Sequence, residues 1–310
     1  MHKISFVSPT FNEEQNVEEL FNRVSEIWKS YPQYEFEYIF IDNASKDGTV
    51  EKLKAIASLD KRLKIIVNIR NFGHIRSPYW GLMQAKGDAV IYLASDLQDP
   101  PELVPEFIKQ WEMGYKIILA VKPASEGNAT VHFFRKLYYR ILNKISDIEL
   151  INDTTGFGLY DKRVMDEIRK INDPYPYLRG LICELGFPVK KIEFNQPRRL
   201  RGVSKNNFYT LFDIAMLGIV SHSLVPIRIA SFIGMGIGLI SLGAGFIFLI
   251  AKLIWWNTFP IGIAPILIMS LSLFGLLFIF IGILGEYIAS IQNYVQKRPI
   301  VVESERINFK

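Results

Sequence analysis

Short apolar segments alternate with helical patterns along the first half of the chain. Strand-length apolar runs lie at residues 4–8, 38–42, 64–68 and 89–94, and each is followed by apolar residues at helical spacing. Strands that alternate with helices in this way predict βαβ units and a mostly parallel sheet with helices on both faces. We therefore expect residues 1–204 to form one α/β domain.

Two long uncharged runs follow this domain. No charged residue occurs at 229–251 or at 253–285, and each run exceeds the roughly 20 apolar residues needed to cross a bilayer core. A pair of buried helices in a large soluble core is the alternative, but soluble helices rarely stay apolar all round at this length. The sequence therefore predicts a transmembrane hairpin at 227–287, with helices at about 229–252 and 261–284.

The segments that flank the hairpin predict its orientation. Residues 205–226 have aromatic and aliphatic residues at helical spacing, which suits either an amphipathic helix in the membrane interface or an ordinary core helix. Basic residues precede and follow the hairpin, whereas its connecting loop offers only Lys252. By the positive-inside rule, the α/β domain and the tail at 288–310 are then cytoplasmic, at the inner membrane. A basic side that faces the membrane explains the net charge of +5 better than nucleic-acid binding, for which there is no motif.

Polar residues follow three of the predicted strands. Asp42, Asn71 and Asp96 each come after an apolar run, and parallel α/β sheets bind ligands beyond the carboxyl ends of their strands. In the stretch SDLQDPPE, Asp99 has a structural explanation as the N-cap of a helix that begins with Pro100. Asp96 has no such explanation, and Mg²⁺ or Mn²⁺ in a phosphate site takes only one or two protein carboxylates. We therefore expect Asp96 to bind a divalent metal ion.

Five motifs, in order and ahead of the hairpin, resemble one enzyme family. They are VSPTFNEEQNV, FIDNASKDGT, RNFGH, AKGDAVIYLASDLQDPPEL and RGVSK. Together they resemble the inverting family 2 glycosyltransferases with a GT-A fold. The closest likeness is to polyisoprenyl-phosphate glycosyltransferases of the bactoprenol glucosyltransferase and dolichol-phosphate mannosyltransferase-like type. The resemblance covers the whole chain and implies a Rossmann-like α/β domain that binds a nucleotide sugar.

The resemblance implies a donor site at the strand ends. The first loop would surround the nucleoside, and Asp42 would accept a hydrogen bond from the base. Asn12 also suits a helix N-cap, and the two roles are compatible. The residues implied to bind the donor are Pro9, Asn12, Glu13, Asp42, Asn71 and Gly73.

The chain departs from the family pattern in two places. Many relatives carry Asp-x-Asp on the fourth strand, where this chain has Ala94, Ser95 and Asp96. Either metal affinity is weaker here, or the diphosphate supplies more of the ligands. The segment NDTTGFGLYDKR has Gly156 where some relatives have an acidic residue. It is closer to the mannosyltransferase-like version, in which Asp153 is the matching acid, although a simple turn residue is the alternative. Asp96 and Asp153 are therefore the catalytic candidates.

The phosphate of the acceptor requires a cationic site. Guanidinium groups suit bidentate phosphate recognition, and RGVSK with its upstream arginines matches the acceptor-phosphate segment of the family. Solvated charges or contacts with anionic lipids are the alternative explanation for these residues. The candidates are Arg135 and Arg140 in one amphipathic helical pattern, and Arg199, Arg201, Ser204 and Lys205 near the hairpin.

These expectations combine into one function. We expect a membrane-anchored inverting glycosyltransferase that moves a single sugar from a nucleotide sugar, preferably a UDP-sugar, to polyisoprenyl phosphate, with Mg²⁺ or Mn²⁺. Transfer to another lipid or glycan acceptor is a second interpretation. A catalytically degenerate scaffold that binds a nucleotide sugar or lipid is a third. A homo-oligomer is implied by the resemblance alone, and the sequence specifies neither the sugar nor the metal.

Overall fold

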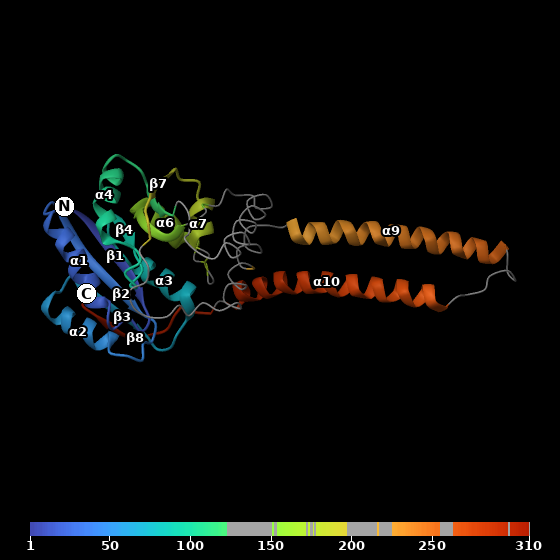
Figure 1. Ribbon diagram of the computed structural model, residues 1–310, viewed down its shortest axis with the longest axis horizontal. Coiled ribbons are helices and arrows are strands. Elements are labelled where there is room, and N and C mark those ends of the chain that lie inside the picture. The colour runs from blue at the N-terminus through green and yellow to red at the C-terminus, as the bar shows by residue number, and fades with distance from the viewer. Residues whose placement is uncertain are drawn as a thin grey trace.

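The computed structural model describes residues 1–122, 151, 154–171, 173, 176, 178–196, 216, 225–254, 263–296 and 298–309. These residues form an α/β domain and two long helices that lead away from it (Figure 1). The interfacial helix expected at 205–226 lies outside the described residues, apart from residue 216 and the start of a long helix at Val225.

An eight-stranded mixed sheet forms the centre of the domain, in the order β7-β5-β6-β4-β1-β2-β3-β8. The first four strands are parallel to one another, which confirms the expectation from the apolar runs. β5 is parallel to β7, whereas β6 and β8 run antiparallel to their neighbours. The strands are β1 His2–Thr10, β2 Tyr34–Asp42, β3 Leu63–Asn68, β4 Ala89–Tyr92, β5 Ile117–Val121, β6 Thr154–Asp161, β7 Val189–Glu193 and β8 Glu303–Ile307.

Helices cover both faces of the sheet. Alternate residues of a strand point to opposite faces, so Phe6 and Phe40 lie in one buried cluster, and Val7 and Ile41 in the other. The first cluster packs against α1, α2 and α4, and the second against α3, α6 and α7. Burial of both faces explains why the strands are continuous apolar runs in the sequence. The helices are α1 Val17–Lys29, α2 Thr49–Leu59, α3 Gly73–Gln84, η1 Pro101–Leu103, α4 Val104–Glu112, α6 Lys162–Ile171 and α7 Leu178–Glu184.

Two long helices lie side by side beyond the domain (Figure 1). α9 spans Val225–Ile254 and α10 spans Ile263–Val295, so they contain most of the two apolar runs, and α10 continues past its expected end at 284. Gly234 lies against Phe280, where an added Cβ would come within 3.2 Å of the ring. Large apolar side chains are exposed on both helices. Within the part of the chain that the structure describes, no helix meets the length and hydropathy required of a membrane span.

The C-terminal segment joins the sheet instead of forming a separate tail. β8 pairs antiparallel with β3 and covers that edge of the sheet. Beyond it, Asn308 Nδ2 donates to the carbonyl oxygens of Ala57 and Leu63, each at 2.8 Å. The tail expected at 288–310 is therefore divided, because its first residues extend α10 and its last residues belong to the α/β domain.

Candidate active site

The carboxyl ends of β1, β2 and β4 form one rim of the sheet. β1 lies between β2 and β4, so the chain reverses direction across the sheet when it passes from β3 to β4. Such a topological switch point is where open α/β sheets bind ligands. β5 ends and β6 begins at the same rim, because Gly158 is paired with Tyr92 and Thr154 with Val121. Loops from both halves of the sheet therefore converge here.

Hydrogen bonds through Asn12 fasten the loops after β1 and β2 to each other. Asn12 has a φ of +57°, a left-handed backbone that Asn tolerates better than most residues. Its N–H donates to Ser45 Oγ, and its Oδ1 accepts the Lys46 N–H, both at 2.8 Å. The expected N-cap role of Asn12 is wrong, because α1 begins only at Val17, with Asn16 before it. Asn12 instead holds the two loops together.

Glu13 in the same loop and Pro9 near the end of β1 both hold this part of the rim in place. The buried Glu13 carboxylate accepts a hydrogen bond from Asn16 Nδ2 at 2.6 Å, and the Glu13 N–H donates to Thr49 Oγ1 at 2.9 Å. The Pro9 carbonyl oxygen accepts the Ser95 hydroxyl at 2.7 Å. Through these contacts, the loop after β1 is connected both to α2 and to the loop after β4.

Asp42 ends β2 beneath the rim. Its side chain is 0% exposed, and its carboxylate accepts hydrogen bonds from the Ser45 N–H at 2.9 Å, from the Ser45 hydroxyl and from Thr10 Oγ1 at 3.4 Å. Burial raises the pKa of Asp42 above its ordinary value, although these donors oppose the effect. For Asp42 to accept a hydrogen bond from a base, as expected from the sequence, the Ser45 turn would have to move aside and expose the buried carboxylate.

Asn43 connects β2 with the loop after β3, and the sequence interpretation overlooked it. Its Nδ2 donates to Asn71 Oδ1 at 3.0 Å and to the Gly73 carbonyl at 3.1 Å. Its Oδ1 accepts the Phe72 N–H at 2.8 Å and Asn68 Nδ2 at 3.2 Å. Asn71 and Gly73 are thereby brought to the end of β2. A polar residue directly after a strand was the signal that could have identified Asn43.

The loop after β4 presents Asp96 at the rim. The side chain is half-buried, and its Oδ1 accepts the Gln98 N–H at 3.2 Å. On one side Ser95 is bonded to Pro9, and on the other the buried Leu97 has a left-handed φ of +61°. Its neighbours thus constrain the backbone that carries Asp96. This position suits the metal-binding carboxylate that the sequence predicted.

Asp99 is not the helix cap that the sequence suggested. Pro101 has no N–H group, so a cap at Asp99 would lack one of its two usual donors, and η1 begins without a side-chain cap. The carboxylate instead turns back, so that Oδ2 accepts the Ala94 N–H at 3.0 Å and Oδ1 lies 3.4 Å from Thr155 Oγ1. Burial, with a smaller contribution from the charge of Asp96, raises the pKa of Asp99 to about 6.

The rim suits a divalent cation that takes few ligands from the protein. Among the described residues, no group of three or more His, Cys, Asp or Glu side chains is arranged to hold a metal ion. Mg²⁺ often binds through one or two carboxylates and completes its shell with water and phosphate oxygens. Asp99 is 1% exposed, which leaves Asp96 as the accessible carboxylate of this loop. The residues present therefore fit Mg²⁺ or Mn²⁺ bound together with a diphosphate.

Several predicted site residues lie outside the described part of the chain. Asp153 is one of them, and Thr154, the described residue that follows it, begins β6 at the rim. Roles for the undescribed residues stay predictions. The residues concerned are Asp153, Arg135, Arg140, Arg199, Arg201, Ser204 and Lys205.

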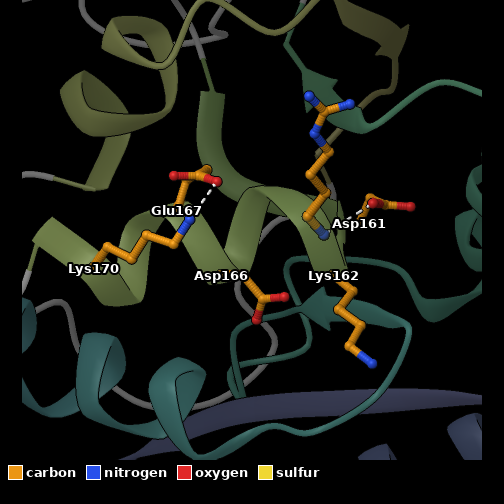
Figure 2. Close-up of a pocket in the computed structure, with 6 residues that line it drawn as sticks. Asp161, Lys162, Asp166, Glu167 and Lys170 are labelled. Atoms are coloured by element: carbon orange, nitrogen blue, oxygen red, sulfur yellow. Dashed lines mark hydrogen bonds and ion pairs between the residues drawn. The ribbon is translucent and has the colours of Figure 1, made fainter.

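A charged groove lies at the opposite end of the sheet (Figure 2). β6 ends at Asp161, which is paired with Ala89 at the start of β4, so the groove is at the amino ends of the parallel strands. One of its ion pairs joins Glu167 and Lys170 at 2.8 Å. The groove is thus a charged surface around α6, separate from the rim. It is lined by Asp161, Lys162, Arg163, Asp166, Glu167 and Lys170.

Known proteins are similar to this chain over nearly its whole length. Uncharacterized glycosyltransferase YkcC of Bacillus subtilis (strain 168) is 32% identical, over 96% of this chain and 92% of the relative. The SfII prophage-derived bactoprenol glucosyl transferase of Shigella flexneri is 34% identical, over 99% of each chain. Among solved structures, S. aureus TarS 1-349 in complex with UDP-GlcNAc is 19% identical, with a TM-score of 0.42 over 72% of this chain and 68% of that one. The family model of glycosyl transferase family 2 matches residues 5–169, which include the rim loops after β1, β2 and β4, and the chain belongs to this family.

Proposed function

We propose that the chain transfers a single sugar from a nucleotide sugar to polyisoprenyl phosphate, with inversion, at the cytoplasmic face of a membrane. Membership of family 2 makes the protein a glycosyltransferase. The structural observation that best supports this specific reaction is the rim around Asp96, at the switch point of the sheet. Relatives named bactoprenol glucosyl transferase, at 33–34% identity over nearly the full chain, support a polyisoprenyl acceptor.

Asp96 would hold the divalent ion at the donor diphosphate. When bound, such an ion supplies positive charge that stabilises the leaving nucleoside diphosphate. Asp99 and Ser95 anchor the backbone on the N-terminal side of Asp96, so the carboxylate stays in position as charge develops on the leaving group. The adjoining loops after β1 and β2, fastened through Asn12, would form the wall around the nucleoside.

The acceptor phosphate would act as the nucleophile. A lipid monophosphate is anionic near neutral pH and needs little help from a base. Its oxygen attacks the anomeric carbon on the face opposite the diphosphate. The bond to the lipid phosphate forms as the bond to the nucleoside diphosphate breaks, and the configuration of the sugar inverts. Alignment of the two substrates is then the main task of the enzyme. Asp153 and the basic residues at 135–140 and 199–205 would orient the acceptor.

The long helices α9 and α10 would keep this site at a bilayer surface. α9 has 30 residues, and a helix of that length is about 45 Å long, which exceeds a hydrocarbon core of roughly 30 Å. The lipid phosphate would lie beside the α/β domain while its chain stays in the membrane. Basic residues on both flanks of the helices favour a cytoplasmic domain. Exposed apolar side chains that would face lipid include Phe232, Leu239, Phe246, Phe274 and Phe278.

Transfer of labelled sugar in isolated membranes tests the proposal. Membranes that contain the overexpressed protein receive a panel of radiolabelled nucleotide sugars, polyisoprenyl phosphate and Mg²⁺ or Mn²⁺. We expect at least one donor to give label in the organic phase, and we expect it to disappear with EDTA, without acceptor lipid or with Asp96→Asn. Asp161→Asn is the matched control, because it removes the same charge at the opposite end of the sheet and should retain transfer.

The other outcomes separate the alternative functions. Tight binding of a nucleotide sugar without extractable label would contradict the lipid acceptor and favour a different one. Absence of both binding and label would favour a scaffold. Full transfer by Asp96→Asn would contradict the metal-binding role of that residue.

A further inference from the structure

The C-terminal segment contacts both ends of residues 70–75, which comprise the end of the loop after β3 and the start of α3 and are called loop 70–75 below. Before the loop, the Ile69 N–H donates to the Val302 carbonyl oxygen at 3.0 Å. After the loop, the Arg76 guanidinium donates to the Pro299 carbonyl oxygen, 223 residues further along the chain. One short C-terminal stretch therefore bridges the loop from end to end.

Further contacts fix this stretch on α3 and β3 together. Trp80 on α3 donates its indole N–H to the Glu303 carboxylate. Ser304 Oγ donates to the Val67 carbonyl oxygen at 3.0 Å, and Val301 is buried. These contacts, with the β3–β8 pairing, attach the end of the chain to the two elements between which the loop lies.

The bridged loop reaches the rim through Asn43. Asn43 bonds to Asn71 Oδ1 and to the Gly73 carbonyl oxygen, as described above. Within the loop, the Arg70 guanidinium lies 4.0 Å from the centre of the Phe72 ring. The C-terminal stretch thus holds the loop at its two ends, and Asn43 holds it in the middle.

We propose that Arg76 and Trp80 are positioning residues, which act through the C-terminal stretch 299–304 to hold loop 70–75 in place for the donor. The inference rests on the proposed function, in which Asn71 and Gly73 line the donor pocket. A loop that is already ordered loses less conformational entropy when a ligand binds, so its affinity for the ligand is higher. Since α10 ends at Val295, the same contacts connect the long helices with the donor side of the site.

Substitution of the two residues tests this inference. Arg76→Ala removes the donor to Pro299, and Trp80→Phe keeps an aromatic ring but removes the donor to Glu303. We expect faster amide hydrogen exchange at residues 70–75 in each variant. We also expect the KM for the nucleotide sugar to rise by about tenfold, as for loss of one hydrogen bond to a charged group, with kcat within about twofold. Arg76→Lys should recover part of the lost affinity.

Lys54→Ala is the matched control. Lys54 on α2 pairs with Glu305 of β8 at 2.6 Å, so the variant weakens attachment of the same strand away from the loop. It should leave KM and the exchange of 70–75 unchanged. Unchanged exchange or unchanged KM in both Arg76→Ala and Trp80→Phe would overturn the inference, even if the wild type transfers sugar normally. If the wild type uses no donor, the proposed function fails, and the exchange measurement alone decides whether the C-terminal stretch holds the loop.

Discussion

Carboxylates at the two ends of the sheet have opposite surroundings. At the amino ends of the parallel strands, Glu37 is 2% exposed and lies 2.7 Å from the Nζ atoms of both Lys3 and Lys64. Burial alone would raise the pKa of Glu37, but these ammonium groups and further hydrogen bonds lower it to about 2. At the same end, Asp161 lies 3.0 Å from Lys116 Nζ, and its hydrogen-bond donors likewise outweigh burial and lower its pKa.

At the carboxyl ends, burial prevails for Asp42 and Asp99. Asp42 and Asp99 are bonded mainly to backbone N–H groups and hydroxyls, and burial raises the pKa of both above the ordinary value. Carboxylates that already have cationic partners stabilise the fold. Those with raised pKa values mark the end of the sheet where an added cation would gain the most. Perturbed ionisable groups of this kind are typical of functional sites.

The largest expected effect is the loss of transfer in Asp96→Asn. We expect kcat to fall by about 100-fold or more, as for removal of a group that stabilises charge in the transition state. The urea unfolding midpoint should change little, because the Asp96 side chain is half-buried at the rim. Asp161→Asn should show the reverse, with a lower midpoint and near-normal kcat. If the two variants lose activity equally, the two ends of the sheet do not differ in function.

Glu37→Gln should have the largest effect on stability. We expect the free energy of unfolding at pH 7 to fall by about 3 kcal/mol, because the substitution removes the negative charge that pairs with the half-buried ammonium groups of Lys3 and Lys64. The contribution of Glu37 is complete above the ordinary glutamate pKa of 4.5 and is lost as the pH falls toward about 2. Urea titrations should therefore show the wild type and the variant converging over this range. A difference that does not depend on pH would contradict the role of the ion pairs.

Asp99→Asn should make the protein more stable at neutral pH. The folded pKa of about 6 exceeds the ordinary aspartate value of 3.8, so the folded state disfavours ionisation and loses stability as pH rises between them. Asn keeps an acceptor for the Ala94 N–H but carries no charge. With EDTA present, we expect a gain of about 2 kcal/mol in the free energy of unfolding at pH 7.5, which shrinks by pH 4. A less stable variant at pH 7.5 would mean that the charge of Asp99 is paired in the folded state.

Ala94→Asp should have the smallest effect. It restores the second carboxylate of the Asp-x-Asp pattern two residues before Asp96. An additional carboxylate ligand should raise the affinity for Mn²⁺ in the presence of UDP by about fivefold. Isothermal titration calorimetry measures this change, with Ala94→Ser as the uncharged control. Equal affinity in both variants would show that the diphosphate already supplies the missing ligand.

Sequence patterns predicted the parts of this fold that depend on local signals. The first four apolar runs became β1–β4, because strands buried on both faces need continuous apolar residues. Polar residues directly after those runs had to meet at one rim once the strands were parallel. Strand direction alone therefore placed Asp42, Asn71 and Asp96 at the same edge of the sheet.

The structural features that the sequence did not predict depend on contacts between segments that are distant along the chain or that meet only after a loop folds back. β8 contains Glu303, Glu305 and Arg306, and a charged edge strand has no apolar pattern that would reveal its pairing with β3. The direction of the Asp99 side chain was also missed. The sequence showed a capping pattern at Asp99. The Asp99 carboxylate instead accepts the Ala94 N–H, which comes within reach only when the loop folds back.

Binding of Mn²⁺ to the purified protein in detergent tests the central claim most directly. The signal of the free ion in electron paramagnetic resonance falls as the protein binds it. In the presence of UDP, we expect the wild type and Asp161→Asn to bind Mn²⁺ equally, and Asp96→Asn to bind it at least about tenfold more weakly. Equal binding by the wild type and Asp96→Asn, or weaker binding by Asp161→Asn alone, would contradict a cation site at the carboxyl ends of the strands.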